Sequence, residues 1–302
     1  MRIGVDIGGT KIEAITLAPN GAIVARERVP TPKGDYEGTV AATASLVRGL
    51  LQALGEPAPI GVGVPGTHSS ITGLMTNSNS VCLIGKPLQK DLENAIGQPI
   101  RVANDANCFA LSEAADGAAA GRPVVFGVIL GTGVGGGLVI RGQTNDGHNG
   151  IAGEWGHNPL PAPSGNETPG PDCYCGRSGC IEQFLSGPAF ARDHAAATAT
   201  PPKQPAQIEA AALAGDGAAR ASVARYTDRL ARALGTVINL IDPDAIVLGG
   251  GMSNMKSLYQ DVPRLWHRYV HAERISTALL PPRHGDSSGV RGAAWLWPET
   301  AQ

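Results

Sequence analysis

The first thirty positions contain three short apolar runs, each about the length of a β-strand. They predict strands at Arg2–Asp6, Ile12–Leu17 and Ala22–Arg28. A glycine-rich turn separates the first two strands, and Asn20-Gly21 is typical of a tight hairpin turn between the second and the third. The chain therefore begins with a β-hairpin pattern.

Two longer segments show the spacing of three and four between apolar residues that is typical of amphipathic helices. They are Tyr36–Leu54, with Gly55 as its C-terminal cap, and Gly217–Ile241. The remaining predicted elements are strands at Ile60–Val64, Ile100–Ala103 and Ala245–Leu248, a helix from Asn104-Asp105 to about Ala118, a short helix at Gly292–Trp297, and loops at 161–172 and 195–205.

The opening pattern repeats half a chain later. Val124–Leu130 is an apolar strand, residues 131–137 form a glycine turn, and Leu138–Arg141 is a second strand. A repeated strand, glycine turn and strand indicates two related α/β halves. We expect an N-terminal lobe over 1–120, joined by the C-terminal helix at about 288–302, and a C-terminal lobe over 121–287.

Composition narrows the possible partners. The chain has 302 residues, a formal net charge of −2, and no segment that concentrates lysine and arginine. This argues against nucleic acid or an anionic membrane as a partner. There is no long apolar run and no signal peptide, so we expect a cytoplasmic protein that acts on small molecules.

Three glycine clusters each follow an apolar strand, and they are the first candidate for chemistry. Backbone N–H groups free of side-chain bulk can bind phosphate oxygens, and threonine hydroxyls add donors. A single glycine turn is usually only a turn, but three of them favour a phosphate site. The candidate phosphate-binding residues are Asp6, Gly8, Gly9, Thr10, Lys11, Thr132, Gly133, Gly135, Gly136, Gly249, Gly250 and Gly251.

Two other nucleotide motifs are excluded. No cluster matches the Gly-x-x-x-x-Gly-Lys-Ser/Thr pattern of a Walker loop. Gly131, Gly133 and Gly136 match the Gly-x-Gly-x-x-Gly dinucleotide fingerprint, but that motif must begin a helix. Here Leu138-Val139-Ile140 continues as a strand, so the context does not fit.

Two acidic residues lie at the ends of predicted strands. Asp6 could hold Mg²⁺ through water beside the first phosphate turn, or it could bond the amides of that turn. Asp105 could be a helix N-cap, the commonest role at such a junction, or a general base that accepts the proton of a sugar hydroxyl. In the second case Asn104 would bind the sugar.

His157, Cys173, Cys175 and Cys180 form the strongest local signal. One imidazole and three thiolates are the ligands of a closed tetrahedral zinc site, which leaves no position to activate water. The expected zinc is therefore structural and folds a small loop over 157–182. Glu154 and Glu182 flank this loop and could accept hydrogen bonds from sugar hydroxyls, or they could be ordinary solvated acids.

These motifs together resemble the ROK family of sugar kinases and repressors, in the family's order and over nearly the whole chain. The matching segments are Asp6-Ile-Gly-Gly-Thr-Lys11, Asn104-Asp105, Leu130-Gly-Thr-Gly133, Glu154-Trp-Gly-His157, Cys173-x-Cys-Gly-x-x-Gly-Cys-x-Glu182 and Leu248-Gly-Gly-Gly251. The resemblance implies a two-lobed actin/hexokinase-like (ribonuclease H-like) fold with duplicated β-sheet cores, ATP and Mg²⁺ between the lobes, structural Zn²⁺, and a homodimer.

The resemblance also implies residue roles. Asp105 would be the catalytic base, and the four zinc ligands would be His157, Cys173, Cys175 and Cys180. The residues expected to bind the sugar are Gly66, Asn79, Asn104, Asp105, Glu154, His157 and Glu182.

Two branches of the family compete for the substrate. Residues 153–161 and 284–297 look like the bacterial fructokinase (mannokinase-type) branch, whereas residues 104–113 and 131–137 look equally like N-acetylglucosamine kinases. We expect transfer of the ATP γ-phosphoryl group to the 6-hydroxyl of D-fructose. The alternatives are N-acetylglucosamine, mannose or glucose. A sugar-responsive regulator is disfavoured because the first phosphate strand begins at residue 2, without a preceding DNA-binding segment, and because Asp105 and the first glycine turn are present.

Overall fold

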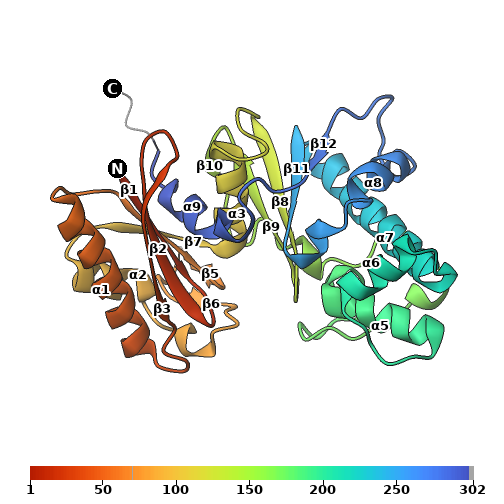
Figure 1. Cartoon of the computed structure of the whole chain (residues 1–302), viewed down its shortest axis with the longest axis horizontal. Coiled ribbons are helices and arrows are strands. Elements are labelled where there is room, and N and C mark those ends of the chain that lie inside the picture. The colour runs from red at the N-terminus through yellow and green to blue at the C-terminus, as the bar shows by residue number, and fades with distance from the viewer. Residues whose placement is uncertain (70, 299–302) are drawn as a thin grey trace. The chain divides into compact units, whose positions relative to one another are not determined.

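The computed structural model describes residues 1–69 and 71–298 and divides the chain into two compact units (Figure 1). The first unit comprises Met1–Pro123, Gly137–Ala152 and the segment from Arg283 onward. The second comprises Val124–Gly136 and Gly153–Pro282. The boundary drawn from the sequence near residue 120 put 137–152 with the second lobe, whereas these residues belong with the first unit here.

The sheet of the first unit has the order β3-β2-β1-β4-β7. Its first three strands are antiparallel neighbours: β1 (Arg2–Ile7), β2 (Lys11–Leu17) and β3 (Ile23–Pro30). Two parallel strands complete it, β4 (Ile60–Val64) next to β1 and β7 (Ile100–Asn104) next to β4. All five were predicted, with ends shifted by no more than two residues.

Helix α1 (Tyr36–Leu54) has the predicted bounds, and Gly55 ends it in the left-handed conformation with φ 69°. Helix α3 (Asp105–Ala115) is three residues shorter than predicted. The unit also contains α2 (Leu88–Ile96), the short strands β5 (Thr67–His68) and β6 (Met75–Thr76), and the 3₁₀ turn η1 (Val81–Leu83), none of which was predicted.

The last helix of the described chain, α9 (Ser288–Ala294), follows the 3₁₀ turn η5 (Gly285–Ser287) and packs on β1, β4 and α3. Glycines make this close approach possible. A Cβ atom on Gly4 or Gly61 would collide with backbone oxygens of α9, and one on Gly292 would collide with the Cys108 carbonyl of α3.

The predicted bounds of this helix, Gly292–Trp297, were wrong. The helix begins four residues earlier and ends at Ala294. Its start was hidden because Ser288, Gly289 and Gly292 are poor helix formers, and packing on the sheet overrides their low propensity. Residues 299–302 of the predicted C-terminal segment lie outside the described residues.

The second sheet has the order β10-β9-β8-β11-β12. Its strands are β8 (Val124–Leu130), β9 (Val134–Ile140), β10 (Gln143–Thr144), β11 (Ala245–Gly249) and β12 (Ala278–Leu280). Strand β11 runs parallel to both β8 and β12, while β9 and β10 are antiparallel. This is the arrangement of the first sheet again, so the predicted duplication is confirmed.

One boundary in this sheet was predicted wrongly. Strand β9 begins at Val134 and not at Leu138, so Gly135, Gly136 and Gly137 are strand residues. Gly136 is required there because a Cβ would lie 2.9 Å from both Phe126 and Trp155. Gly137 likewise allows a close approach, because a Cβ there would lie 2.5 Å from the Ala106 carbonyl oxygen of α3. The turn itself is only Gly131–Gly133.

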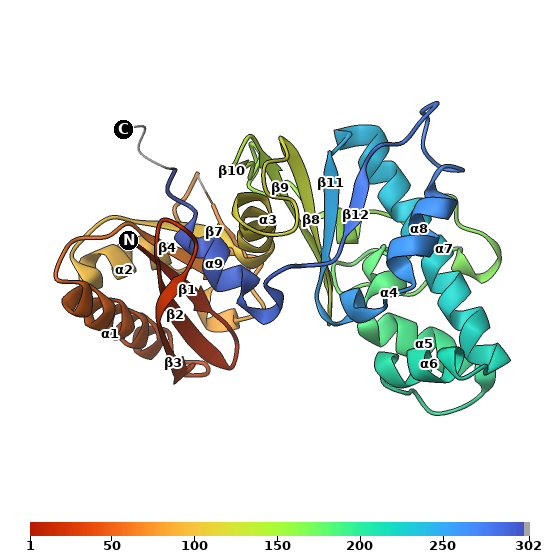
Figure 2. The same ribbon diagram turned by 45° about the horizontal axis from the view of Figure 1, so that its top comes forward.

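The second unit also contains helices, of which α5 and α6 pack on α7 (Figure 2). They are α4 (Glu182–Leu185), α5 (Gly187–Thr198), α6 (Pro205–Leu213), α7 (Gly217–Ile241) and α8 (Leu258–Trp266), with 3₁₀ turns η2 (Trp155–His157), η3 (Gly165–Glu167) and η4 (Gly251–Asn254). Helix α7 has the predicted bounds. The loop predicted at 195–205 is too long, because α5 continues to Thr198 and α6 begins at Pro205.

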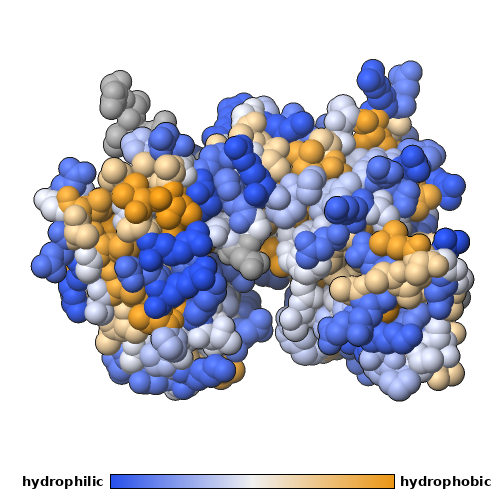
Figure 3. All heavy atoms as spheres, in the orientation of Figure 1, coloured by the Kyte–Doolittle hydropathy of each residue, from blue (hydrophilic) through white to orange (hydrophobic). Residues whose placement is uncertain are grey.

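Polar residues cover much of the face shown in Figure 3. Among the described residues, no helix combines the length and apolar character needed to cross a membrane.

A buried ion cluster attaches the segment after η2 to helix α7. Glu167 pairs with Arg229 and with Arg232 at 2.8 and 2.9 Å, and all three side chains are buried. Burial raises the pKa of Glu167, but hydrogen bonds from Arg232 and Arg229 outweigh it and lower the pKa to about 2. Arg232 also donates to the carbonyls of Pro161 and Ala162. The loop predicted at 161–172 is thus held firmly to the unit.

Candidate functional site

In the first unit, Asp6 lies at the end of β1 beside the first glycine turn. The turn is closed by the Gly8 amide, which donates to the Lys11 carbonyl at 2.9 Å, and by the Thr31 hydroxyl, which donates to the Gly8 carbonyl at 2.6 Å. Burial, followed by the charges of Asp105 and Glu13, raises the pKa of Asp6 to about 6. The acid is thus held next to a like charge, which a cation would relieve.

At the junction before α3, Asn104 takes the N-cap position that the sequence left open for Asp105. Asn104 is the N-cap of α3: its Oδ1 accepts from the Ala106 amide at 2.8 Å, and its Nδ2 donates to the Gly66 carbonyl at 3.0 Å. Asp105 is the first residue of the helix and is solvent-exposed, with Oδ1 2.8 Å from the Ala106 amide. Because Asn104 already caps the helix, the exposed carboxylate of Asp105 is not needed as the cap.

Gly66 and Asn79, two predicted sugar-binding residues, come from the segment between β4 and α2. Gly66 has φ 108°, and a Cβ there would lie 2.8 Å from Ser78. The Ser78 hydroxyl donates to the Pro65 carbonyl at 2.7 Å, which holds the two strands of this segment together. Asn79 follows Ser78 and is exposed.

In the second unit, the other two glycine clusters are neighbours. The Gly131 amide donates to the Gly133 carbonyl at 3.0 Å, and the Gly187 amide donates to the Gly131 carbonyl at 2.8 Å. Gly250 has φ 77°, and a Cβ there would lie 2.5 Å from the Leu130 carbonyl oxygen. The turn with exposed Thr132 and the Gly249–Gly251 segment therefore lie together.

The residues flanking the Cys/His loop are docked on the same glycine turn. The Oε2 atom of buried Glu182 accepts from the Val134 amide at 3.0 Å. The Trp155 indole donates to the Gly135 carbonyl at 2.9 Å, which fixes the short η2 turn between exposed Glu154 and half-buried His157. The structure thus brings Glu154, His157 and Glu182 into one region of the second unit.

The four predicted zinc ligands converge: their ligand atoms all lie within 4.8 Å of one another. Cys173 Sγ is 3.6 Å from His157 Nδ1, and Cys175 Sγ is 3.6 Å from Cys180 Sγ. Zn–S bonds of about 2.3 Å in a tetrahedron place sulfur atoms about 3.8 Å apart. Both the donor set and the spacing fit zinc.

The loop is shaped for this convergence. The Cys173 amide donates to the Arg177 carbonyl at 2.7 Å, and Gly176 and Gly179 have φ 85° and 73°. Hydrogen bonds with Arg177 lower the pKa of the Cys175 thiol to about 6. A thiol of lowered pKa is readily available as the thiolate that zinc requires.

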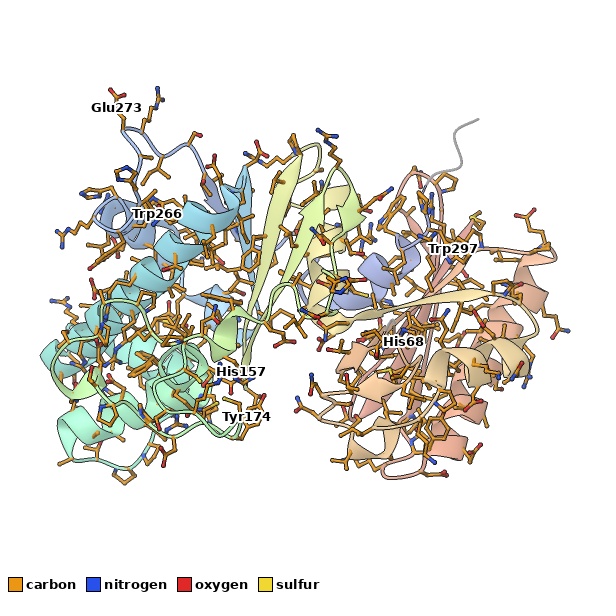
Figure 4. All side chains as sticks on the ribbon, turned by 180° about the vertical axis from the view of Figure 1, so that it is seen from behind. His68, His157, Tyr174, Trp266, Glu273 and Trp297 are labelled. Carbon is orange, nitrogen blue, oxygen red and sulfur yellow. The ribbon has the colours of Figure 1, made fainter. Side chains whose placement is uncertain are left out.

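Tyr174 is a residue of this region that the sequence reasoning missed. Its hydroxyl is 3.0 Å from His157 Nε2, on the other side of the imidazole from the thiols, and Figure 4 shows the two side chains next to each other. Burial, followed by the charge of Glu182, raises the pKa of Tyr174 to about 12. Its position between Cys173 and Cys175 was the only signal in the sequence.

A cavity of about 770 Å³ lies among α6, α7 and α8 of the second unit. Asn254, Lys256 and Ser257 contribute to its wall, and they follow the third glycine cluster directly in the chain. The sequence did not predict this cavity, because α6 and α8, which supply much of its lining, were not predicted.

The two-lobed α/β fold is that of ROK sugar kinases of known structure. The ROK hexokinase of Thermus thermophilus has a TM-score of 0.86 at 31% identity, covering 98% of this chain and 97% of that one. A ROK glucokinase of Streptomyces griseus, solved with glucose and AMPPNP, has a TM-score of 0.76 at 30% identity over 99% of both chains.

The family model for the ROK family matches residues 2–300, and the chain belongs to that family. Curated relatives include the N-acetyl-D-glucosamine kinases of Pectobacterium atrosepticum, 41% identical over 98% of both proteins, and of Vibrio vulnificus, 40% identical over 98% of this chain and 99% of the relative.

We predict that one zinc ion per chain co-purifies and that Cys175→Ser loses it. A Cys₃His site contributes folding free energy directly, so the variant should also melt at a lower temperature. Elemental analysis and thermal unfolding measure the two effects. Cys82→Ser, at a cysteine outside the cluster, is the control and should keep its zinc. Fully stable, zinc-free wild-type protein would contradict the prediction.

We also predict that Asp6→Asn stabilises the nucleotide-free protein at pH 8. The folded-state pKa of Asp6, about 6, is above its usual 3.8, so its contribution to stability is fully present below about pH 4 and lost as the pH rises through 6. The advantage of the variant in melting temperature should therefore shrink as the pH is lowered from 7 to 4. Asp35→Asn, at the N-cap of α1, is the control. If the melting temperature of Asp6→Asn exceeded that of the wild type by the same amount at every pH, the pKa of Asp6 would not be raised.

Proposed function

We propose that this protein transfers the γ-phosphoryl group of ATP to the 6-hydroxyl of a hexose, and that N-acetyl-D-glucosamine is its substrate. The observation that carries the reaction is the junction before α3, where Asn104 caps the helix and leaves the Asp105 carboxylate exposed at its first residue. Membership of the ROK family, which supports a sugar kinase, agrees with this chemistry.

The choice of sugar rests on the relatives. Proteins named N-acetyl-D-glucosamine kinases are 39% to 41% identical to this chain over 98% of its length. Fructose, expected from residues 153–161 and 284–297, stays the second candidate. Those two segments are short. The alignment with the N-acetyl-D-glucosamine kinases also covers residues 66–79 and 104–113, where further sugar contacts are expected, so we give it more weight.

Asp105 acts as the general base in this proposal. Its carboxylate accepts the proton of the 6-hydroxyl as that oxygen bonds to the γ-phosphorus and the bond from phosphorus to the ADP oxygen breaks. An aspartate in this role typically contributes a factor of ~10²–10⁴ to the rate. Asn104, fixed by its bond to Gly66, is positioned to hydrogen-bond the sugar.

The glycine turns supply the phosphate contacts. Amides of Gly8–Thr10 in the first unit, and of Thr132–Gly133 and Gly249–Gly251 in the second, are the candidate donors. Asp6 would hold Mg²⁺ through water, and the cation would neutralise charge on the transferring phosphoryl group. Since Gly135 and Gly136 are strand residues of β9, we assign them a packing role beside that site. Lys11, which contacts Glu13 at 2.9 Å, balances charge next to the turn.

The cavity among α6, α7 and α8 is our candidate for the adenosine part of ATP. It adjoins the third glycine cluster along the chain, and its wall combines apolar side chains such as Leu213 and Val223 with polar or charged ones such as Asn254 and Lys256, so it offers both an apolar surface and hydrogen-bonding groups to a nucleoside.

Glu154, His157 and Glu182 are the sugar-side residues that we assign to the second unit. Buried Glu182 has one oxygen committed to the Val134 amide, which leaves the other to accept from a sugar hydroxyl. Carboxylates held in this way bind hydroxyls at little cost in side-chain entropy. We retain the homodimer as a prediction.

A kinetic comparison of sugars tests the substrate. We expect kcat/KM for N-acetyl-D-glucosamine to exceed that for fructose, mannose and glucose. A buried acceptor left unpaired by the wrong sugar costs about 1–3 kcal/mol, which corresponds to factors of about 5–150. A coupled assay of ADP release measures this. Higher kcat/KM for fructose would return the assignment to the fructokinase branch while leaving the kinase reaction in place.

Asp105→Asn tests the base. We expect kcat to fall by ~10²–10⁴-fold, with the fold and sugar affinity retained, because the amide cannot accept the proton. Thermal unfolding and calorimetric sugar binding serve as checks. Asp35→Asn makes the same change at another helix start and should keep wild-type kcat. If Asp105→Asn kept more than about a tenth of the wild-type rate, Asp105 would not be the base.

A further inference from the structure

Tyr174 is an exposed aromatic residue in the middle of the Cys/His loop. Its side chain is 77% exposed, although the cysteines on either side turn toward the metal-ligand group. A single exposed aromatic residue on a surface needs no explanation. This one differs because its orientation is fixed at both ends.

The backbone of Tyr174 lies inside a tight loop. The Gly176 amide donates to the Cys173 carbonyl at 3.0 Å, and the Cys173 amide donates to the Arg177 carbonyl at 2.7 Å. With a metal bound, both neighbouring side chains would be ligands as well. The backbone around Tyr174 therefore has little freedom, even though the ring is at the surface.

The tip of the side chain is held by His157. The Tyr174 hydroxyl lies 3.0 Å from Nε2, and the two rings meet edge to face with centroids 5.2 Å apart and planes at 86°. Because Nδ1 faces Cys173 Sγ, a metal-bound His157 carries its proton on Nε2 and donates it to the tyrosine oxygen.

This arrangement leaves the hydroxyl proton of Tyr174 free to be donated. A tyrosine hydroxyl has one donor and two lone pairs, and His157 uses only one lone pair. His157, which this hydroxyl contacts at 3.0 Å, lies in the region of the second unit that also holds Glu154 and Glu182. The ring thus belongs to the same region as the three residues assigned to the sugar in the second unit.

We propose that Tyr174 is a sugar-binding residue, an inference that rests on the proposed hexose kinase function. Its hydroxyl accepts from His157 and donates to an oxygen of the hexose, while the flat face of its ring covers apolar C–H groups of the sugar. An apolar ring with a polar tip suits a ligand that has both surfaces. His157, assigned to the sugar above, then acts on it through Tyr174, because its Nδ1 faces the metal-ligand group and its Nε2 contacts the tyrosine.

Two substitutions test the proposal in the zinc-loaded enzyme. We expect Tyr174→Phe, which removes only the hydroxyl, to raise the KM and the calorimetric Kd for N-acetyl-D-glucosamine about 3- to 10-fold. Tyr174→Ala, which also removes the ring, should raise them about 10- to 100-fold. In both variants kcat, the KM for ATP and the zinc content should stay at the wild-type values.

Tyr269→Phe is the matched control. It removes a hydroxyl that contacts Asp228 at 2.8 Å elsewhere in the same unit, and it should leave sugar affinity unchanged. An unchanged sugar Kd in both Tyr174 variants would overturn the proposal. Loss of zinc in parallel with affinity would also overturn it, since Tyr174 would then serve only the metal site.

The experiments distinguish a failure of the Tyr174 proposal from a failure of the proposed kinase function. If the wild-type protein prefers another hexose, the same ratios are measured with that sugar. A wild-type protein that phosphorylates no hexose overturns the kinase proposal whatever the two variants do.

Discussion

The close packing of α9 against β1, β4 and α3 is the constraint on which the first unit depends. It brings a segment from the end of the chain beneath strands from its beginning, and it works only because Gly4, Gly61 and Gly292 carry no Cβ. The same contact places Gly289 of α9 next to the Asp6 carboxylate, where a Cβ would lie 3.7 Å from it. Because α9 supports both β1 and α3, it positions Asp6 and Asp105 together. A larger residue at Gly4 or Gly61 would force α9 away from the sheet, and one at Gly292 would force it away from α3.

In the second unit, the candidate site residues are held in place by side-chain clusters and not by the packing of a helix on a sheet. His157 and Glu182, which we assign to the sugar, lie at the two ends of a segment that contains only turns and short bridges between η2 and α4. Two sets of side chains hold this segment in place. One is the convergence of His157 with three cysteines, and the other is the buried ion cluster of Glu167 with Arg229 and Arg232. The cluster holds the part of the loop before the cysteines against α7. The Cys/His group therefore closes the segment on itself, and the ion cluster ties it to α7.

Much of this could be predicted from the sequence, for physical reasons that differ between elements. Helices α1 and α7 were predicted with their bounds because long amphipathic patterns and a left-handed cap at Gly55 are local signals. The start of strand β9 was not, because Gly135–Gly137 resemble a turn in the sequence, whereas Gly136 packs against Phe126 and Trp155 and Gly137 against α3. Helix α9 was misplaced for the same reason. Glycines chosen for close approach look like loop residues until their partners are known.

In the candidate site, too, features encoded by neighbouring residues could be predicted, and features that depend on tertiary contacts could not. The ligand set of the loop was evident because its residues are close in the chain and chemically distinctive. The capping role of Asn104 required the observed hydrogen bond to Ala106, and the cavity among α6, α7 and α8 required tertiary structure. Tyr174 was missed because nothing about an aromatic residue between two cysteines reveals which way its ring turns.

The position of Tyr174 matters for the choice of hexose. If zinc takes all four protein ligands, no coordination position remains for a sugar, and the metal influences the substrate only through the geometry of the loop. His157 then has a single nitrogen left, and that nitrogen is 3.0 Å from Tyr174. The ligands themselves cannot distinguish fructose from N-acetyl-D-glucosamine, because they perform the same task with either sugar. Discrimination must come from residues between and beside them, such as Tyr174 and Glu154. A motif that consists mainly of the ligands therefore identifies the family and says little about the hexose.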